Sequence, residues 1–149
     1  MVGCIITGHG GFAPGLKAAY EMIGGDAEDF VAVPFTNENT AEYPDELVAA
    51  IDDLLARDGE VVVFCDLMGG QPCQQAMLAQ VSRPGVEVVC GANLPMLLEC
   101  LMSRDGTAAE LADLAQEIGR MGVAHVERLE ADAAPADADA AFAGEGDGI

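Results

Sequence analysis

The fold of this chain is decided by the stretch Cys4-Ile5-Ile6-Thr7-Gly8-His9-Gly10-Gly11-Phe12-Ala13-Pro14-Gly15-Leu16. An apolar run over residues 2–6 predicts a buried strand, which stops at the glycines around His9. The apolar residues after these glycines recur at helical spacing, at Leu16, Ala19, Tyr20 and Ile23. Pro14 suits the first turn of a helix. The stretch therefore predicts a strand, a glycine-rich turn and a helix, with one imidazole in the turn.

The turn around His9 has the features of an anion site. Open backbone N–H groups beside a helix N-terminus favour a phosphate, and we expect Gly8, Gly10 and Gly11 to take part. His9 itself has three interpretations: a turn residue without a role, a metal ligand, or a nucleophile toward phosphorus. A metal site would need more ligands, and the only other histidine is His125. We therefore expect a nucleophile, with no metal and no cofactor.

The rest of the chain alternates strands with helices. Strands are predicted at residues 30–35, 60–66 and 86–91, and helices at about 43–57, 71–81, 94–103 and 107–121. This alternation predicts an α/β, doubly wound fold, with four parallel strands and helices on both faces. Residues 124–129 alternate polar and apolar side chains, which is typical of a fifth strand at the edge of the sheet.

Asp66 ends the strand predicted at residues 60–66 and is the best candidate to assist His9. A nucleophilic imidazole needs an acceptor on its second nitrogen, which fixes the tautomer and stabilises the cation. Taken alone, a carboxylate at a strand end is more often a cap or turn residue. Ligands of doubly wound sheets bind beyond the carboxyl ends of the strands, however, and both His9 and Asp66 follow such ends. Together they predict a catalytic pair.

The composition limits the class of protein. A formal net charge of −20 argues against nucleic acid as a partner, because phosphate backbones require Lys and Arg. No apolar run approaches the ~20 residues of a membrane helix, and no basic segment precedes the first strand, so we expect a cytoplasmic protein. Five cysteines without CxxC spacing are expected to be buried thiols. We expect one domain over residues 1–130 and a disordered acidic tail over residues 131–149, which has too few apolar residues to offset the entropy of ordering.

Three motifs together resemble a known family. They are Thr-Gly-His-Gly at residues 7–10, Asp-x-x-Gly-Gly-x-Pro at residues 66–72 and Gly-x-Asn-x-Pro-Met-Leu-x-Glu at residues 91–99. In this order and at these strand ends, residues 2–129 resemble the enzyme IIA component of the mannose-type sugar phosphotransferase system. The resemblance implies a fifth, antiparallel strand that can be exchanged across a homodimer. It also implies that His9 takes a phosphoryl group from HPr and gives it to a IIB protein or domain, which serves the membrane components IIC and IID.

The resemblance also assigns roles to the residues of the turns. It matches His9 and Asp66 to the catalytic pair. Beside Gly8, Gly10 and Gly11, the expected phosphate-site turns include Gly69, Gly70 and Gln71. The expected partner contacts are Phe12, Leu67, Met68 and Asn93. Two positions depart from the family: Gln71 stands where Ser or Thr is usual, and Met68 stands where the best-known members have tryptophan.

Two other functions stay open on the sequence. A related IIA-like subunit feeds dihydroxyacetone kinases by the same chemistry, although the Asn-Leu-Pro-Met stretch at residues 93–96 favours the sugar branch. The second alternative is a non-catalytic regulatory binding module, in which the glycine turns serve only the fold. Incubation with enzyme I, HPr and phosphoenolpyruvate separates that module from a phosphocarrier.

Overall fold

The computed structural model describes residues 1–129; the predicted acidic tail lies outside the described residues. The elements follow in the order β1 (Gly3–His9), α1 (Phe12–Gly24), β2 (Phe30–Phe35), α2 (Tyr43–Asp58), β3 (Val61–Cys65), α3 (Gln71–Val81), β4 (Val86–Cys90), α4 (Leu94–Met102) and α5 (Ala108–Met121). The strands form one parallel sheet in the order β2-β1-β3-β4. The predicted doubly wound α/β fold is confirmed. No helix within residues 1–129 has the length and apolar character needed to cross a membrane.

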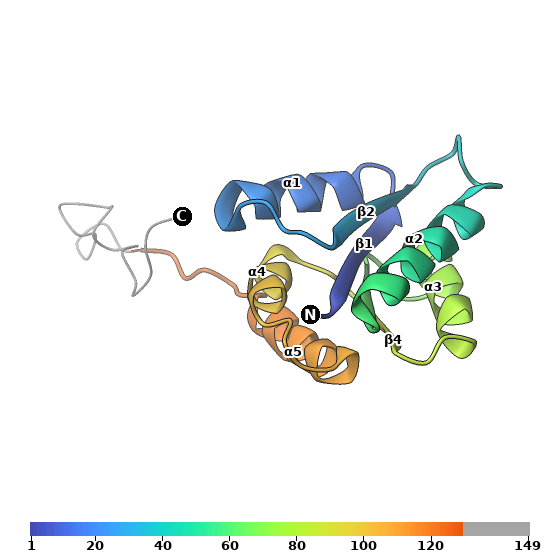
Figure 1. Cartoon of the computed structure of the whole chain (residues 1–149). Coiled ribbons are helices and arrows are strands. Elements are labelled where there is room, and N and C mark those ends of the chain that lie inside the picture. Colours follow the sequence, from blue (N-terminus) through green and yellow to red (C-terminus); the bar gives the residue numbers. More distant parts are fainter. Residues whose placement is uncertain (130–149) are drawn as a thin grey trace.

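Helices cover both faces of the sheet, because successive strand residues point to opposite faces. In β1, Cys4 and Ile6 pack against α1, α4 and α5, whereas Ile5 packs against α2 and α3. Figure 1 shows these two groups of helices on the two sides of the sheet. The central strand β3 alternates in the same way, and all five of its residues are buried. Each fully buried aliphatic side chain contributes roughly 1.5–3 kcal/mol, so these two core clusters hold the strand ends in a fixed frame.

Side-chain caps are present as hydrogen bonds at the start of both α4 and α5. Thr107 and Glu110 form the capping box: Thr107 Oγ1 accepts from the Glu110 N–H at 3.2 Å, and Glu110 Oε2 accepts from the Thr107 N–H at 2.9 Å. Asn93 caps α4, since its Oδ1 accepts from the Met96 N–H at 3.1 Å. Its Nδ2 also donates to the Gly119 carbonyl at 3.0 Å, so Asn93 ties α4 to α5.

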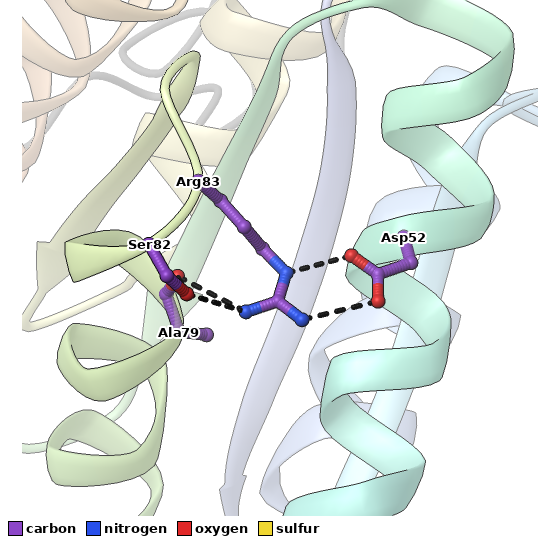
Figure 2. Close-up of polar contacts among 4 residues, drawn as sticks. All are labelled: Asp52, Ala79, Ser82 and Arg83. Atoms are coloured by element: carbon purple, nitrogen blue, oxygen red, sulfur yellow. Dashed lines mark hydrogen bonds and ion pairs between the residues drawn. The ribbon is translucent and has the colours of Figure 1, made fainter.

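Arg83 joins the two helices on the other face of the sheet. Its guanidinium lies between α2 and the end of α3, as Figure 2 shows. Nε is 2.6 Å from Asp52 Oδ1, and Nη2 is 3.1 Å from Asp52 Oδ2. Nη1 donates to the Ala79 carbonyl at 3.3 Å and to Ser82 Oγ at 3.1 Å. The hydrogen bonds from Arg83 hold the pKa of Asp52 below its usual value. The fork geometry of arginine thus connects α2 to the C-terminal end of α3.

The predicted fifth strand does not form within the described chain. Residues 123–129 have no strand partner in the part of the chain that the structure describes, and all of them are exposed. Val123, Val126 and Leu129 are 79%, 77% and 57% exposed. The reason is that a strand requires the free N–H and C=O groups of a neighbour. Alternating polarity indicates an edge strand but does not supply the edge on which it pairs.

Candidate active site

The candidate site lies at the carboxyl edge of the sheet, where β1 and β3 are neighbours. His9 is the last residue of β1, and Asp66 follows directly after β3. The parallel register pairs Thr7 of β1 with Cys65 of β3, so the two strands end at the same level of the sheet. The helices that follow these two strands, α1 and α3, cover opposite faces of the sheet. The carboxyl ends of β1 and β3 are therefore the topological switch point, where ligands of such sheets bind. The predicted convergence of the two residues is therefore what the structure shows.

His9 and Asp66 are joined by two hydrogen bonds to one oxygen. Asp66 Oδ2 lies 2.8 Å from the main-chain nitrogen of His9 and 2.8 Å from its Nδ1. Burial alone raises the pKa of Asp66, but the hydrogen bonds from the His9 N–H and imidazole outweigh it, so the pKa lies below the usual value. Asp66 is thus a carboxylate, which can only accept. In the neutral ring the proton therefore sits on Nδ1, and Nε2 carries the free lone pair.

Two glycines allow this close packing. A side-chain carbon at Gly8 would lie 2.6 Å from Phe12 Cδ1 and 2.8 Å from Asp66 Cγ. A side-chain carbon at Gly70 would lie 2.8 Å from His9 Cε1. Both distances are shorter than real carbon contacts. A larger residue would therefore force the side chain of Phe12 or Asp66 to shift at Gly8, and that of His9 to shift at Gly70.

A cavity of about 730 Å³ opens beside Met68 and Gly69, and a second of about 640 Å³ opens beside His9. The second is lined by His9, Gly10 and Gly11 on one side and by Phe35 and the loop at residues 36–38 on the other. His9 is 46% exposed and Asp66 only 14%, so the imidazole lies open while its acceptor is shielded. The site can therefore admit a group of another protein to the ring.

Phe35 and the loop at residues 36–38 are neighbours of His9 that the sequence analysis missed. The signal was available: β2 also runs parallel to β1, and its last residue, Phe35, is in register with His9. The end of a third parallel strand must reach the same edge of the sheet.

The other predicted site residues are distributed around this edge. Gly10 donates its N–H to the Phe35 carbonyl at 2.7 Å and is not free for an anion, whereas Gly11 lines the cavity. Gln71 is exposed at the first position of α3. Leu67 and Met68 are 59% and 80% exposed. Phe12 is partly buried against the core, and Asn93 forms the cap described above. Gly69 lines the cavity beside Met68.

Comparisons with known proteins agree on one family. The model of the EIIA-man family, described as PTS system fructose IIA component, matches residues 3–118. The chain is 33% identical over 122 residues to the PTS system fructose-specific EIIA component of Bacillus subtilis, covering 81% of this chain and 82% of that one. It is 35% identical over 144 residues to the PTS system mannose-specific EIIAB component of Escherichia coli K12, covering 94% of this chain but only 44% of that protein.

The solved structures give the same result. The mannose/sorbose-specific IIA subunit of the phosphotransferase system from Enterococcus faecalis superimposes with a TM-score of 0.79 at 32% identity, covering 87% of this chain and 97% of that one. Fold and sequence thus define a phosphotransferase-system domain of the IIA class. The chain belongs to the EIIA-man family. Proteins of this family take phosphoryl groups from HPr and pass them to a IIB component for sugar uptake.

Proposed function

We propose that this chain carries the phosphoryl group on Nε2 of His9, receiving it from phospho-HPr and passing it to a IIB protein. The observation that supports this is the bond between Nδ1 and Asp66, which leaves Nε2 as the free nucleophilic atom. Nε2 is also the side of the ring not occupied by the carboxylate. The sugar served would follow from the IIB partner and is not encoded at this site.

The transfer is a displacement at phosphorus. The Nε2 lone pair forms the new N–P bond while the bond between phosphorus and HPr breaks, and its electron pair returns to HPr. The phosphorylated ring keeps its proton on Nδ1 and gains positive character, which the Asp66 carboxylate stabilises at 2.8 Å. Transfer to the IIB acceptor reverses these changes, so the same pair serves both directions.

The N-terminus of α1 supports the phosphoryl group electrostatically. This helix begins at Phe12, three residues after His9, and its first N–H groups carry partial positive charge. Gly11 is the remaining candidate donor of the turn, since the Gly10 N–H is occupied. The exposed pair Leu67 and Met68 provides an apolar contact for HPr and for the IIB protein. We place the reaction in the cytoplasm, which suits the five unpaired thiols.

The functional unit in this proposal is a homodimer. Strand β4 ends the sheet, and the cavity of about 730 Å³ lies along it between α3 and α5. Residues 123–129 of a second copy would pair with this edge and bury Val123, Val126 and Leu129, which are exposed in the single chain.

Phosphorylation by enzyme I, HPr and phosphoenolpyruvate, read by intact mass, tests the proposed function. One phosphoryl group per chain, labile in acid and transferable to a IIB protein, is the expected result. A chain that stays unmodified while a known IIA protein is phosphorylated in the same mixture would indicate a regulatory binding module instead.

A further inference from the structure

The imidazole of His9 is in contact with a second ring besides its carboxylate partner. The centroids of His9 and Phe35 are 5.5 Å apart and the two planes are nearly perpendicular, at 86°. Such edge contacts are the favoured geometry of aromatic pairs. We propose that Phe35, held by Tyr43, is a positioning residue that keeps Nδ1 of His9 on Asp66 and Nε2 toward the cavity.

The ring of His9 needs such a contact because its own torsion does not fix it. Rotation about the bond from Cβ to the ring is broad and roughly two-fold. A half turn would place a carbon where Nδ1 meets Asp66. The side chain is 46% exposed, so solvent borders nearly half of it and restrains none of that part. Gly70 borders the Cε1 edge, and among residues 1–129 Phe35 is the only aromatic ring that packs against His9.

Phe35 is itself fixed from the core. Its ring lies 4.9 Å from that of Tyr43, which is fully buried at the start of α2. Thr7 Oγ1 donates its single proton to the Val33 carbonyl at 2.7 Å, so in the 2.6 Å contact with Tyr43 it must accept. Burial raises the pKa of the Tyr43 hydroxyl, which keeps it protonated as the donor.

These contacts begin and end on the same strand, β1. Thr7 stands two residues before His9 on β1, and the contacts lead from Thr7 to Tyr43, then to Phe35 and back to His9. The register of β1 with β2 places His9 opposite Phe35. The position of the ring is thus tied to the strand that carries it.

The chain provides a matched control pair. Tyr20 and Phe30 also meet edge to face, at 5.6 Å and 84°, and Phe30 is the first residue of the strand that ends at Phe35. Phe30 pairs with Cys4 at the opposite end of β1 and packs in the other core cluster. Phe30→Leu therefore removes a comparable ring from the same strand without touching His9.

The deciding measurement is the tautomer of His9 by ¹⁵N NMR in the full-length, unphosphorylated protein. The wild type should show the proton on Nδ1. In Phe35→Leu we expect a mixture of ring states, and about ten- to hundredfold slower transfer from phospho-HPr because the nucleophile is misplaced. Phe35→Tyr, which keeps the ring, should show the wild-type tautomer and the wild-type rate of transfer. Tyr43→Phe, which keeps the ring but loses the hydroxyl, should give a smaller change in the same direction.

Two results would overturn the positioning role. One is a Phe35→Leu protein whose His9 ring signals equal those of the wild type. The other is a Phe30→Leu protein that changes the signals as much, since the effect would then be general destabilisation. The consequence for the transfer rate rests on the proposed function of His9, but the NMR result does not. A wild type that accepts no phosphate would reject that function and leave the tautomer comparison valid.

Discussion

Both nitrogen donors of His9 meet the same oxygen of Asp66. Oδ2 accepts from the main-chain N–H and from Nδ1, each at 2.8 Å, whereas Oδ1 is buried and has no hydrogen-bond partner among the described residues. An amide in place of Asp66 fails in either orientation. Its NH₂ group would either face two donors or be buried without an acceptor.

Asp66→Asn should therefore weaken both the fold and the transfer. Leaving a buried polar group unsatisfied costs about 1–3 kcal/mol of unfolding free energy. A lost hydrogen bond to a charged ring, worth about 1.5–3 kcal/mol in the transition state, corresponds to roughly ten- to hundredfold slower transfer. Urea unfolding and stopped-flow transfer from phospho-HPr measure the two effects. Asp53→Asn, which removes an exposed carboxylate on α2 that takes no part in the site or in the Arg83 contact, should transfer at the wild-type rate.

His9→Ala should accept no phosphoryl group, because the chain then lacks the imidazole at the carboxyl edge of the sheet. His125→Ala should accept one group per chain, since His125 lies in the exposed segment that follows α5. Intact mass after incubation with enzyme I, HPr and phosphoenolpyruvate reads both variants. Label that persists on the His9 variant would contradict the assignment.

The depressed pKa of Asp66 predicts a pH dependence with a definite sign. A carboxylate whose folded-state pKa is lowered contributes its stability in full above the unfolded value, about 3.9, and loses it as the pH falls through the folded value. The difference in unfolding free energy between wild type and Asp66→Asn should thus shrink as the solution becomes more acidic than about pH 4.

The same pKa should respond to His9. The imidazole and its charge are two of the influences that lower the pKa of Asp66, and His9→Ala removes both while keeping the main-chain N–H. Carboxyl ¹³C NMR should therefore find a higher midpoint for Asp66 in that variant. Equal midpoints would mean that the imidazole does not influence the carboxylate.

Removal of residues 123–149 should convert the proposed dimer into monomers or aggregates, because the edge of β4 then has no cover. Removal of residues 131–149 alone should leave the dimer intact. Light scattering coupled to size-exclusion chromatography gives the mass of each form. A dimer that survives the longer deletion would place the interface elsewhere.

Met68→Asp should slow transfer without unfolding the domain, because Met68 is 80% exposed and contributes little to the core.

The net charge of −20 should also speed encounter with a basic partner. Added salt should then slow association, since charges are screened beyond about 8 Å at physiological ionic strength. If the rate of association were equal at low and high salt, the net charge would serve solubility and not the encounter with the partner.

The pairing of His9 with Asp66 was predictable because each residue follows a buried parallel strand. Strand ends of this kind can be read locally, and the sheet brings them to one edge. The start of α1 was predictable from Pro14, which lies in the first turn of the helix that begins at Phe12, although the apolar spacing begins only at Leu16.

The contacts that orient His9 could not be derived from the sequence. Thr7 and Tyr43 are 36 residues apart, and their hydroxyl bond depends on how α2 packs over β1 and β2. Spacing along the chain carries no information on such a contact. The strand predicted at residues 124–129 stays a prediction, since its pairing depends on a sheet edge whose partner the alternating polarity does not identify.

The contact between Arg83 and Asp52 has a consequence for motion. Helix α3 continues directly from the turn at Gly69 and Gly70, and its outer surface, which includes Leu78 and Val81, lies in solvent. Side chains exposed on this surface add little to the free energy of local opening. Arg83 holds the far end of this helix, so Arg83→Ala should accelerate amide exchange throughout α3, and the wall of the site that touches the His9 ring would open with it.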